Sequence, residues 1–207
     1  MSILGSYPNR QKKEINRKIN KNNKQSQPFQ LECHHAVGET ARAIDYLNRY
    51  IKVEESSWKV NEGIGIGNKP HSIDFHREFI SSITAEKIPS FWFLVDGQKD
   101  IASLIAYHHQ RTLYMAHTTF DPAYSEYSPG LIATRGLLEY ACSRPDIDTY
   151  DPLATPVEQG RPRHKTAWAT HHDPIQTRRI TILRKRGMIG ILARIKQLKD
   201  WVRSVRQ

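Results

Sequence analysis

The sequence predicts an α/β (α+β) domain in which a mixed central sheet, an antiparallel meander plus one parallel strand, is flanked by helices. Strand-like runs rich in β-branched and aromatic residues alternate with stretches in which apolar residues recur at helical spacing. The chain has 207 residues, of which 38% are hydrophobic. That composition is enough for one domain with its own core.

The first elements are expected to be short. Residues 8–24 are polar and basic, and Ile15 and Ile19 are spaced i, i+4, which indicates a short helix with a thin apolar edge. The run NKNNKQSQP is typical of a linker, so residues 1–28 are interpreted as a basic N-terminal helix and linker. Residues 29–33 are expected to form a short strand.

Two helices joined by a glycine-rich turn are expected next. Residues 41–59 form a clear amphipathic helix that ends at Trp58-Lys59, and residues 71–83 form the second. The turn NEGIGIGNKP contains G-x-G-x-G, but no strand precedes it, so a flexible loop is favoured over a nucleotide motif. The expected buried side of the first helix is Ile44, Leu47, Ile51 and Val53.

Three strands follow in sequence. Residues 88–95 are a strong strand, closed by an Asp96-Gly97 turn that leads into residues 101–109, so a hairpin is expected. The strand 111–120 follows almost at once, which indicates a meander. In this strand, alternation predicts Leu113, Met115 and His117 on one side and Tyr114, Ala116 and Thr118 on the other.

The strand 111–120 is followed by a sharp Ser128-Pro129-Gly130 turn that leads into a helix. This stretch is the one around which the rest of the chain is organised. A flexible turn that opens a helix leaves unpaired backbone N–H groups, which suit a phosphate or pyrophosphate. A plain strand-to-helix connection is the alternative, and spacing alone favours it. Residues 148–153 are expected to be a short strand that pairs parallel with an earlier one.

The net charge of +10 is concentrated at the two ends. Up to Lys24 there are seven Lys/Arg residues and one acidic residue, and from Arg178 to the end there are ten Lys/Arg residues and one acidic residue. The body between them keeps 14 basic and 19 acidic residues, which is a charge of −5. Residues 29–177 are therefore the main domain, and residues 178–207 a basic strand and amphipathic helix. Basic ends can approach anionic lipid, RNA or an acidic protein; two solvated helix faces are an equal alternative.

The sequence indicates a cytoplasmic protein. No apolar run approaches the roughly 20 residues that span a bilayer, and the N-terminus lacks the apolar core of a signal peptide. Cys33 and Cys142 are in no metal or redox spacing and are expected to be free thiols in a reducing compartment. A peripheral contact with the inner membrane, made by the basic ends, is the alternative location.

The order helix, strand, strand, strand, SPG-helix, strand resembles the core of the GNAT acyltransferase fold. More narrowly, the chain is similar to the CelD-type acetyltransferase domain of bacterial cellulose and exopolysaccharide gene neighbourhoods. FDPAY (120–124) followed by SPG (128–130) carries the most specific match. The weaker matches are EESSWK (54–59), Tyr150-Asp151 and His164-Lys165.

Members of that family contain two GNAT-like halves, and this chain resembles the second half alone. The resemblance implies a GNAT-like mixed sheet and transfer from acyl-CoA, such as acetyl-CoA, to an amine or hydroxyl of a sugar or cell-envelope/exopolysaccharide precursor. A second GNAT-like half or a homo-oligomer is the implied partner. Such transfer needs a helix N-terminus for the pyrophosphate and a base, often acting through water, for the acceptor.

The cofactor-binding residues that the resemblance implies are the backbone of Ser128, Pro129, Gly130 and Leu131, and the side chain of Lys165. Pro129 can offer only its carbonyl. Lys165, with Arg163 beside it, can pair with phosphate charge; exposed basic loop residues are the alternative interpretation.

Asp151 is the first candidate for the catalytic base or substrate anchor, because open α/β sheets bind ligands at strand carboxyl ends. An Asp that caps a turn before Pro152 is its rival interpretation. His117 is the second candidate base, since imidazole titrates near the working pH range. A lone strand histidine is more often a packing residue.

Glu54, Trp58 and Tyr124 are the candidate substrate-binding residues. The alternative is that Trp58 is core at a helix end and Glu54 a solvated charge. Tyr114, Tyr124 and Tyr127 are candidate proton donors to the leaving thiolate, although most such tyrosines simply pack. The run His171-His172-Asp173 suggests a metal cluster, but adjacent histidines rarely bind one ion, and no metal is predicted.

Two other functions remain open. Fem-type peptidyltransferases resemble this superfamily and use aminoacyl-tRNA, in which case the basic ends contact RNA and binding falls steeply with salt. No aromatic-basic RNA motif supports this function. The other is a non-catalytic half-GNAT module that docks a partner or the membrane through its ends, including the C-terminal helix with Trp201.

Overall fold

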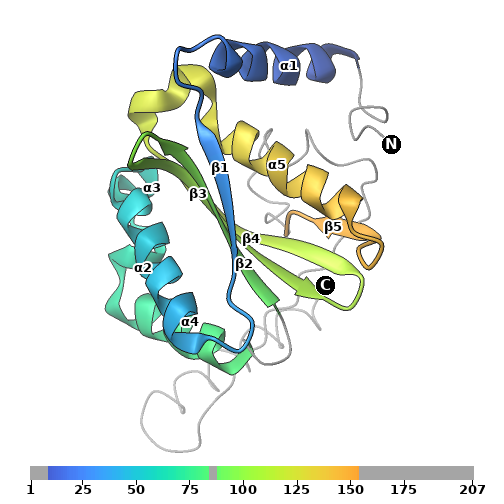
Figure 1. Ribbon diagram of the computed structural model, residues 1–207. Helices are drawn as coiled ribbons and strands as arrows, with labels where there is room; N and C mark the ends of the chain where they lie inside the picture. Colours follow the sequence, from blue (N-terminus) through green and yellow to red (C-terminus); the bar gives the residue numbers. More distant parts are fainter. Residues whose placement is uncertain (1–8, 84–87, 154–207) are drawn as a thin grey trace, which may run out of the picture. The chain divides into compact units, whose positions relative to one another are not determined.

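The computed structural model describes residues 9–83 and 88–153 (Figure 1). All of them lie in one compact unit. The elements, in chain order, are α1 (Asn9–Asn23), β1 (Gln30–His35), α2 (Thr40–Glu55), α3 (Trp58–Asn61), η2 (Ile66–Asn68), α4 (Pro70–Ile83), β2 (Ile88–Asp96), β3 (Lys99–His109), β4 (Thr112–Phe120), η3 (Pro122–Tyr127), α5 (Pro129–Ser143) and β5 (Thr149–Asp151).

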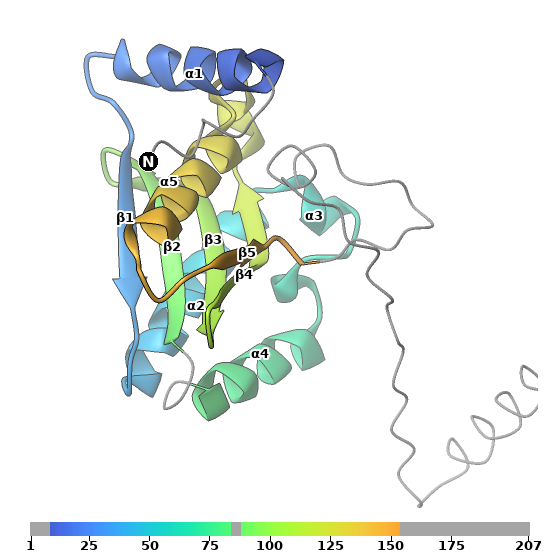
Figure 2. The ribbon, with the colours of Figure 1, turned by 90° about the vertical axis from the view of Figure 1, so that its right-hand side faces the viewer.

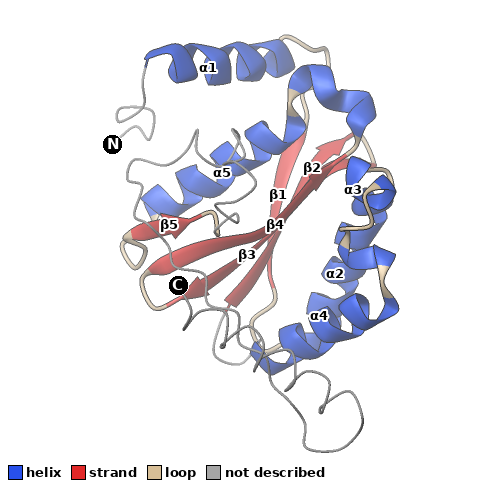
Figure 3. Ribbon diagram, turned by 180° about the vertical axis from the view of Figure 1, so that it is seen from behind, coloured by secondary structure: helices blue, strands red, loops and turns tan. Residues whose placement is uncertain are grey.

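The strands form one sheet in the order β1-β2-β3-β4-β5. Neighbours are antiparallel from β1 to β4, and β4 and β5 are parallel. This confirms the predicted mixed sheet, with its meander and its one parallel pair. Helix α5 covers one face of the sheet, and α2 and α4 cover the other (Figure 3). Each face therefore has its own apolar core.

Strand β4 contains one extra residue. Ile105 on β3 pairs with His117, but the next residue, Ala106, pairs with Met115, so Ala116 is left out of the pairing. An inserted residue of this kind is a β-bulge, and it reverses the alternation of side chains beyond it.

The bulge changes which side of the sheet each later side chain occupies. His117 lies on the α2/α4 face, where it contacts His76. Thr118 lies on the α5 face, where its Oγ1 would be 3.9 Å from a Cβ built on Gly130. The predicted grouping of His117 with Met115 is therefore wrong, because strict alternation was assumed through the bulge.

Helix α2 ends at Glu55, before the predicted end at Trp58-Lys59. The Ser57 hydroxyl accepts a hydrogen bond from the Lys59 N–H at 3.3 Å and begins the separate helix α3. A serine at this position competes for backbone donors and favours a new helix start over continuation. The buried side of α2 is Ala43, Leu47, Tyr50, Val53 and Glu54, so the predicted Ile44 and Ile51 are only half-buried.

Helix α1 packs against η3 and α5 (Figure 2). Its Ile15 is 2% exposed and contacts the cluster that contains Leu138. The helix continues to Asn23, into the segment predicted as a linker. There the buried Asn22 accepts the Phe29 N–H at 3.0 Å, so the segment is anchored to the domain. Among the described residues, no helix has the length and apolar character needed to cross a membrane.

Candidate active site

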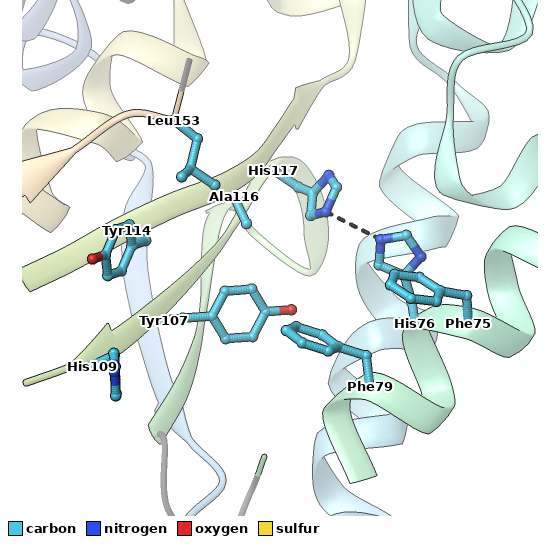
Figure 4. Close-up of a pocket in the computed structure, with 9 residues that line it drawn as sticks. All are labelled: Phe75, His76, Phe79, Tyr107, His109, Tyr114, Ala116, His117 and Leu153. Carbon is cyan, nitrogen blue, oxygen red and sulfur yellow. Dashed lines mark hydrogen bonds between the residues drawn. The ribbon is translucent and has the colours of Figure 1, made fainter. Parts of the chain in front are cut away.

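A cavity of about 300 Å³ opens on the α4 side of the sheet (Figure 4). It is lined by Phe75, His76 and Phe79 from α4, Tyr107 and His109 from β3, Tyr114, Ala116 and His117 from β4, and Leu153 after β5. Its walls are mostly aromatic, and a few polar groups converge on it. This combination is what small-molecule sites in proteins have in common.

The cavity lies where β4 and β5 separate. The two strands pair only from Thr112 to Tyr114 on β4, because β5 ends at Asp151. Ala116 and His117, just beyond that pairing, line the cavity. The bulge at Ala116 and the short β5 therefore open the sheet at the same point and leave room for a substrate beside β4.

His76 and His117 contact each other in this cavity. Their Nε2 atoms are 3.2 Å apart, and His76 Nδ1 is 2.7 Å from the Ser72 carbonyl oxygen. Because a carbonyl oxygen can only accept a hydrogen bond, His76 Nδ1 carries the proton. The Nε2 atom of the neutral His76 ring is then unprotonated and accepts a hydrogen bond. His117 then donates from Nε2, which makes Nδ1 the basic nitrogen of neutral His117.

Tyr50 supports His117 from α2. The two ring centroids are 6.3 Å apart in an edge-to-face arrangement. The Tyr50 hydroxyl donates to Glu54 Oε1 at 3.1 Å and accepts from Lys59 Nζ at 3.3 Å. Burial, with the Glu54 charge, raises the pKa of Tyr50 well above its usual value. Tyr50 is therefore a neutral side chain that packs behind the imidazole.

Glu54 is only 1% exposed, so it is neither a solvated charge nor part of the cavity lining. Its Oε1 accepts from Lys59 and its Oε2 from the Gly67 N–H at 3.1 Å. A Cβ at Gly65 would lie 2.8 Å from Glu54 Oε2, which explains the glycine there. The carboxylate fixes the glycine-rich turn against α2, which gives that turn a structural role. Trp58 is 43% exposed, away from the cavity lining and the core.

The start of α5 offers fewer unpaired backbone N–H groups than the sequence predicts for the Ser128-Pro129-Gly130 turn. The Ser128 N–H donates to Ser125 O, and the Leu131 N–H donates to Ser128 O at 2.9 Å. Pro129 has no N–H. Of these four residues, Gly130 is the one whose N–H has no hydrogen bond to the described chain. Any phosphate contact at this turn therefore depends mainly on that N–H and on the helix dipole.

The residues before this turn make contacts that hold η3 against the domain. Asp121 begins η3, where its side chain accepts the Ala123 N–H at 2.9 Å and Lys99 Nζ at 2.8 Å. Tyr124 donates to Asp96 Oδ2 at 3.1 Å and packs edge-to-face on Phe29. Tyr127 also packs edge-to-face on Phe29. Tyr124 and Tyr127 do not line the cavity, whereas Tyr114 does.

Asp151 ends β5, as predicted, and its Oδ1 accepts the Leu153 N–H at 2.8 Å. This is the turn cap that was its rival interpretation. Leu153 lines the cavity and Asp151 does not. The structure thus brings His117, but not Asp151, to the cavity.

Several predicted residues lie outside the described part of the chain. These are Arg163, Lys165, the His171-His172-Asp173 run, and the strand and helix of residues 178–207. Within residues 9–83 and 88–153, no group of three or more His, Cys, Asp or Glu is placed to hold a metal ion. Cys33 and Cys142 are free thiols, as predicted, and both are exposed.

Sequence reasoning missed His76, Tyr107 and Tyr50. His76 did carry a signal, because it lies between Phe75 and Phe79 on a predicted helix whose apolar side must face the sheet. Tyr107 and Tyr50 carried none, since an aromatic residue in a strand or helix is usually a packing residue.

A mixed sheet with a bulged fourth strand, helices on both faces and a cavity where β4 and β5 separate defines the acetyltransferase fold of the GNAT class. Residues 9–166 match the sequence profile of a family described as "Acetyltransferase (GNAT) domain". The chain therefore belongs to the GNAT acetyltransferase domain family, whose members use acetyl-CoA.

One solved structure agrees on the fold. The chain is similar to an aminoglycoside acetyltransferase from an uncultured soil metagenomic sample, in complex with sisomicin, with a TM-score of 0.51 and 9% identity over 73% of this chain and 96% of that one. A possible acetyltransferase from Clostridium difficile 630 gives a TM-score of 0.49 at 12% identity, over 73% and 98% of the two chains. No curated protein matches the sequence.

Proposed function

We propose that this chain transfers an acyl group from acyl-CoA to an amine or hydroxyl of a sugar-type acceptor, with His117 as the base. The observation that carries the proposal is the bulge at Ala116, which turns His117 into the cavity and against His76. Membership of the GNAT family supports acyl transfer as the reaction class. The position of His117 in the cavity supports its role as the base.

The reaction follows from ordinary acyl-transfer chemistry. The lone pair of the acceptor nitrogen or oxygen attacks the thioester carbon, the carbon–sulfur bond breaks, and the CoA sulfur leaves as a thiolate. His117 Nδ1, directly or through water, takes the proton that the acceptor loses, and the thiolate is protonated as product. His76 accepts a hydrogen bond from His117 Nε2–H, which keeps the basic nitrogen of His117, Nδ1, on the opposite side of its ring.

The donor is proposed to lie along β4. Thr118 borders Gly130 on the α5 face, while the adjacent His117 lines the cavity on the other face. With the CoA phosphates at the Gly130 N–H, the thioester can reach His117 through the opening between β4 and β5. Lys165 and Arg163 remain predicted phosphate partners.

The acceptor is proposed to be a sugar or a cell-envelope/exopolysaccharide precursor, as the CelD-type resemblance implies. Phe75 and Phe79 stack with ring planes 8° apart at the cavity, and they are 60% and 37% exposed. Aromatic faces of this kind suit the apolar side of a sugar ring. A fold neighbour holds sisomicin, an aminoglycoside. A second GNAT-like half, from another chain or another copy, is the proposed partner, and the cytoplasm, where acyl-CoA is made, is the proposed location.

Release of free CoA thiol tests this proposal. Purified chain is mixed with acetyl-CoA or a longer acyl-CoA and a set of amino sugars, and His117→Gln is compared with His71→Gln, which replaces an exposed histidine of α4. We expect acceptor-dependent release that falls about 100-fold or more in His117→Gln and is unchanged in His71→Gln. Equal rates in the two variants would remove His117 from the mechanism.

The tRNA-dependent alternative has less support. Lys21 of α1 forms an ion pair of 2.6 Å with Glu126, and Lys18 donates to the Glu126 carbonyl at 2.7 Å. These two basic side chains bind the chain itself. Salt-dependent tRNA binding in the absence of acyl-CoA turnover would favour this alternative over the proposal.

A further inference from the structure

Tyr107 of β3 has a buried hydroxyl group that nothing in the described chain satisfies. The residue is 9% exposed, and its hydroxyl has no hydrogen-bond partner among the residues that the structure describes. A buried polar group without a partner destabilises the folded state. Such a group in a native protein calls for an explanation.

The location of the hydroxyl suggests the explanation. Within residues 9–83 and 88–153, the buried side-chain polar atoms without a partner belong to Ser103, Tyr107, His108 and Thr119. Of these four residues, Tyr107 is the one that lines the cavity. Its ring extends from β3 toward α4 and packs edge-to-face on Phe79, with centroids 5.4 Å apart (Figure 4). The Tyr107 side chain is thus held by packing in the wall of the same cavity as His117, with its hydroxyl buried in that wall.

We propose that the Tyr107 hydroxyl donates a hydrogen bond to an oxygen of the substrate bound in this cavity, which makes Tyr107 a further catalytic residue. The inference rests on the acyl transfer proposed above. The oxygen belongs either to the thioester carbonyl of the donor or to a hydroxyl of the acceptor. In both cases the bound substrate supplies the partner that the free protein lacks.

The chemistry of the Tyr107 phenol favours a role as a hydrogen-bond donor over a role as a general acid. Burial raises the pKa of Tyr107, so the phenol stays protonated and is a poor source of a proton for the leaving thiolate. A neutral phenol fixed in an aromatic cavity can instead stabilise negative charge that develops on a carbonyl oxygen, without giving up its proton. This role differs from the thiolate protonation considered above for Tyr114, Tyr124 and Tyr127.

Tyr107→Phe tests the inference, with Tyr46→Phe as the matched control on α2, outside the cavity lining. We expect acyl-CoA turnover with an amino sugar to fall about tenfold or more in Tyr107→Phe, while the thermal midpoint of the ligand-free protein stays equal or rises. The stability should not fall, because the removed hydroxyl has no partner to lose. Tyr46→Phe should retain the wild-type turnover.

The kinetic constants identify the oxygen. A fall in kcat, with slower acyl-CoA hydrolysis in the absence of acceptor, assigns it to the thioester. A rise in the acceptor KM alone assigns it to the acceptor. Unchanged turnover in Tyr107→Phe, or a loss of turnover accompanied by a lower thermal midpoint, would overturn this inference and leave the proposed acyl transfer untouched. No turnover in the wild-type protein would instead reject the proposed acyl transfer, and this inference with it.

Discussion

The Arg49 guanidinium binds the Asp100 carboxylate through two parallel hydrogen bonds, each 2.6 Å long. The pair joins α2 to the start of β3, and the hydrogen bond to Asp100, opposed by burial, raises the pKa of Arg49. The guanidinium also lies 3.9 Å from the centre of the Phe93 ring. Since Tyr50 is the next residue, this contact fixes the part of α2 that packs behind His117.

Arg49→Lys should therefore lower the free energy of unfolding by about 1–2 kcal/mol, because an ammonium cannot reproduce the two-armed contact or the stacking on Phe93. Urea titration measures the change. Arg42→Lys is the matched control, since its ion pair with Glu39 is exposed and should be worth only a few tenths of a kcal/mol. Equal effects at both positions would show that the two-armed geometry contributes nothing.

His76→Phe should reduce kcat by about 10- to 100-fold while it leaves the KM for acyl-CoA unchanged. The substitution keeps an aromatic ring on α4 but removes the acceptor for His117 Nε2–H, so the imidazole loses a hydrogen bond that favours one tautomer. Steady-state kinetics with saturating acceptor measure this. Wild-type kcat in His76→Phe would mean that His117 is oriented by other contacts.

Gly130→Asp should weaken binding of acetyl-CoA by about tenfold or more, whereas Gly130→Asn should weaken it much less. A Cβ fits at this position, since its nearest neighbour outside the turn would be Phe120 Cδ1 at 3.7 Å. The two side chains have nearly the same shape, so the difference between them reports the negative charge beside the CoA phosphates. Calorimetric titration measures both, and equal affinities would place the phosphates elsewhere.

Asp121 should make the fold sensitive to acid. Burial opposes its ionisation, but the hydrogen bonds from Lys99 and from the Ala123 N–H outweigh burial and hold its pKa below the usual value. A carboxyl with a lowered pKa in the folded state stabilises the fold above its unfolded pKa of about 4, and that stability is lost as the pH falls through the folded pKa.

Lys99→Met should consequently be less stable than the wild type at about pH 7, and the difference should shrink as the pH falls toward about 2. Urea titrations across this range measure it. A difference that stays constant with pH would show that Lys99 contributes through its ammonium group over the Tyr124 ring and not through the Asp121 charge.

The order of helices and strands could be predicted because most elements have a strong period, and several end at a clear turn. The Asp96-Gly97 turn separates β2 from β3 and the Ser128-Pro129-Gly130 turn leads into α5, as predicted, and α4 begins one residue before its predicted range. Glu54 could not be placed, since a charged side chain on a helix is exposed unless paired, and one of its partners, the Gly67 N–H, comes from the glycine-rich turn.

The candidate site could be predicted only in part. His117 was named because imidazole is chemically versatile, but the sequence placed it on the wrong face. The bulge that corrects its position depends on the pairing of β3 with β4, which no local pattern in β4 reveals. His76 and Tyr107 become site residues only through the packing of α4 on the sheet, a contact between elements that are separate in the sequence.

Ala116 carries no chemistry of its own, yet it sets the face on which His117 lies. A relative that lacked one residue between Met115 and His117 would restore regular pairing and point its histidine toward α5. Such a relative would keep every side chain that matters here, and a comparison of residue types alone would count its base as present. In this fold, the length of β4 is as informative as the identity of its histidine when activity is inferred across the family.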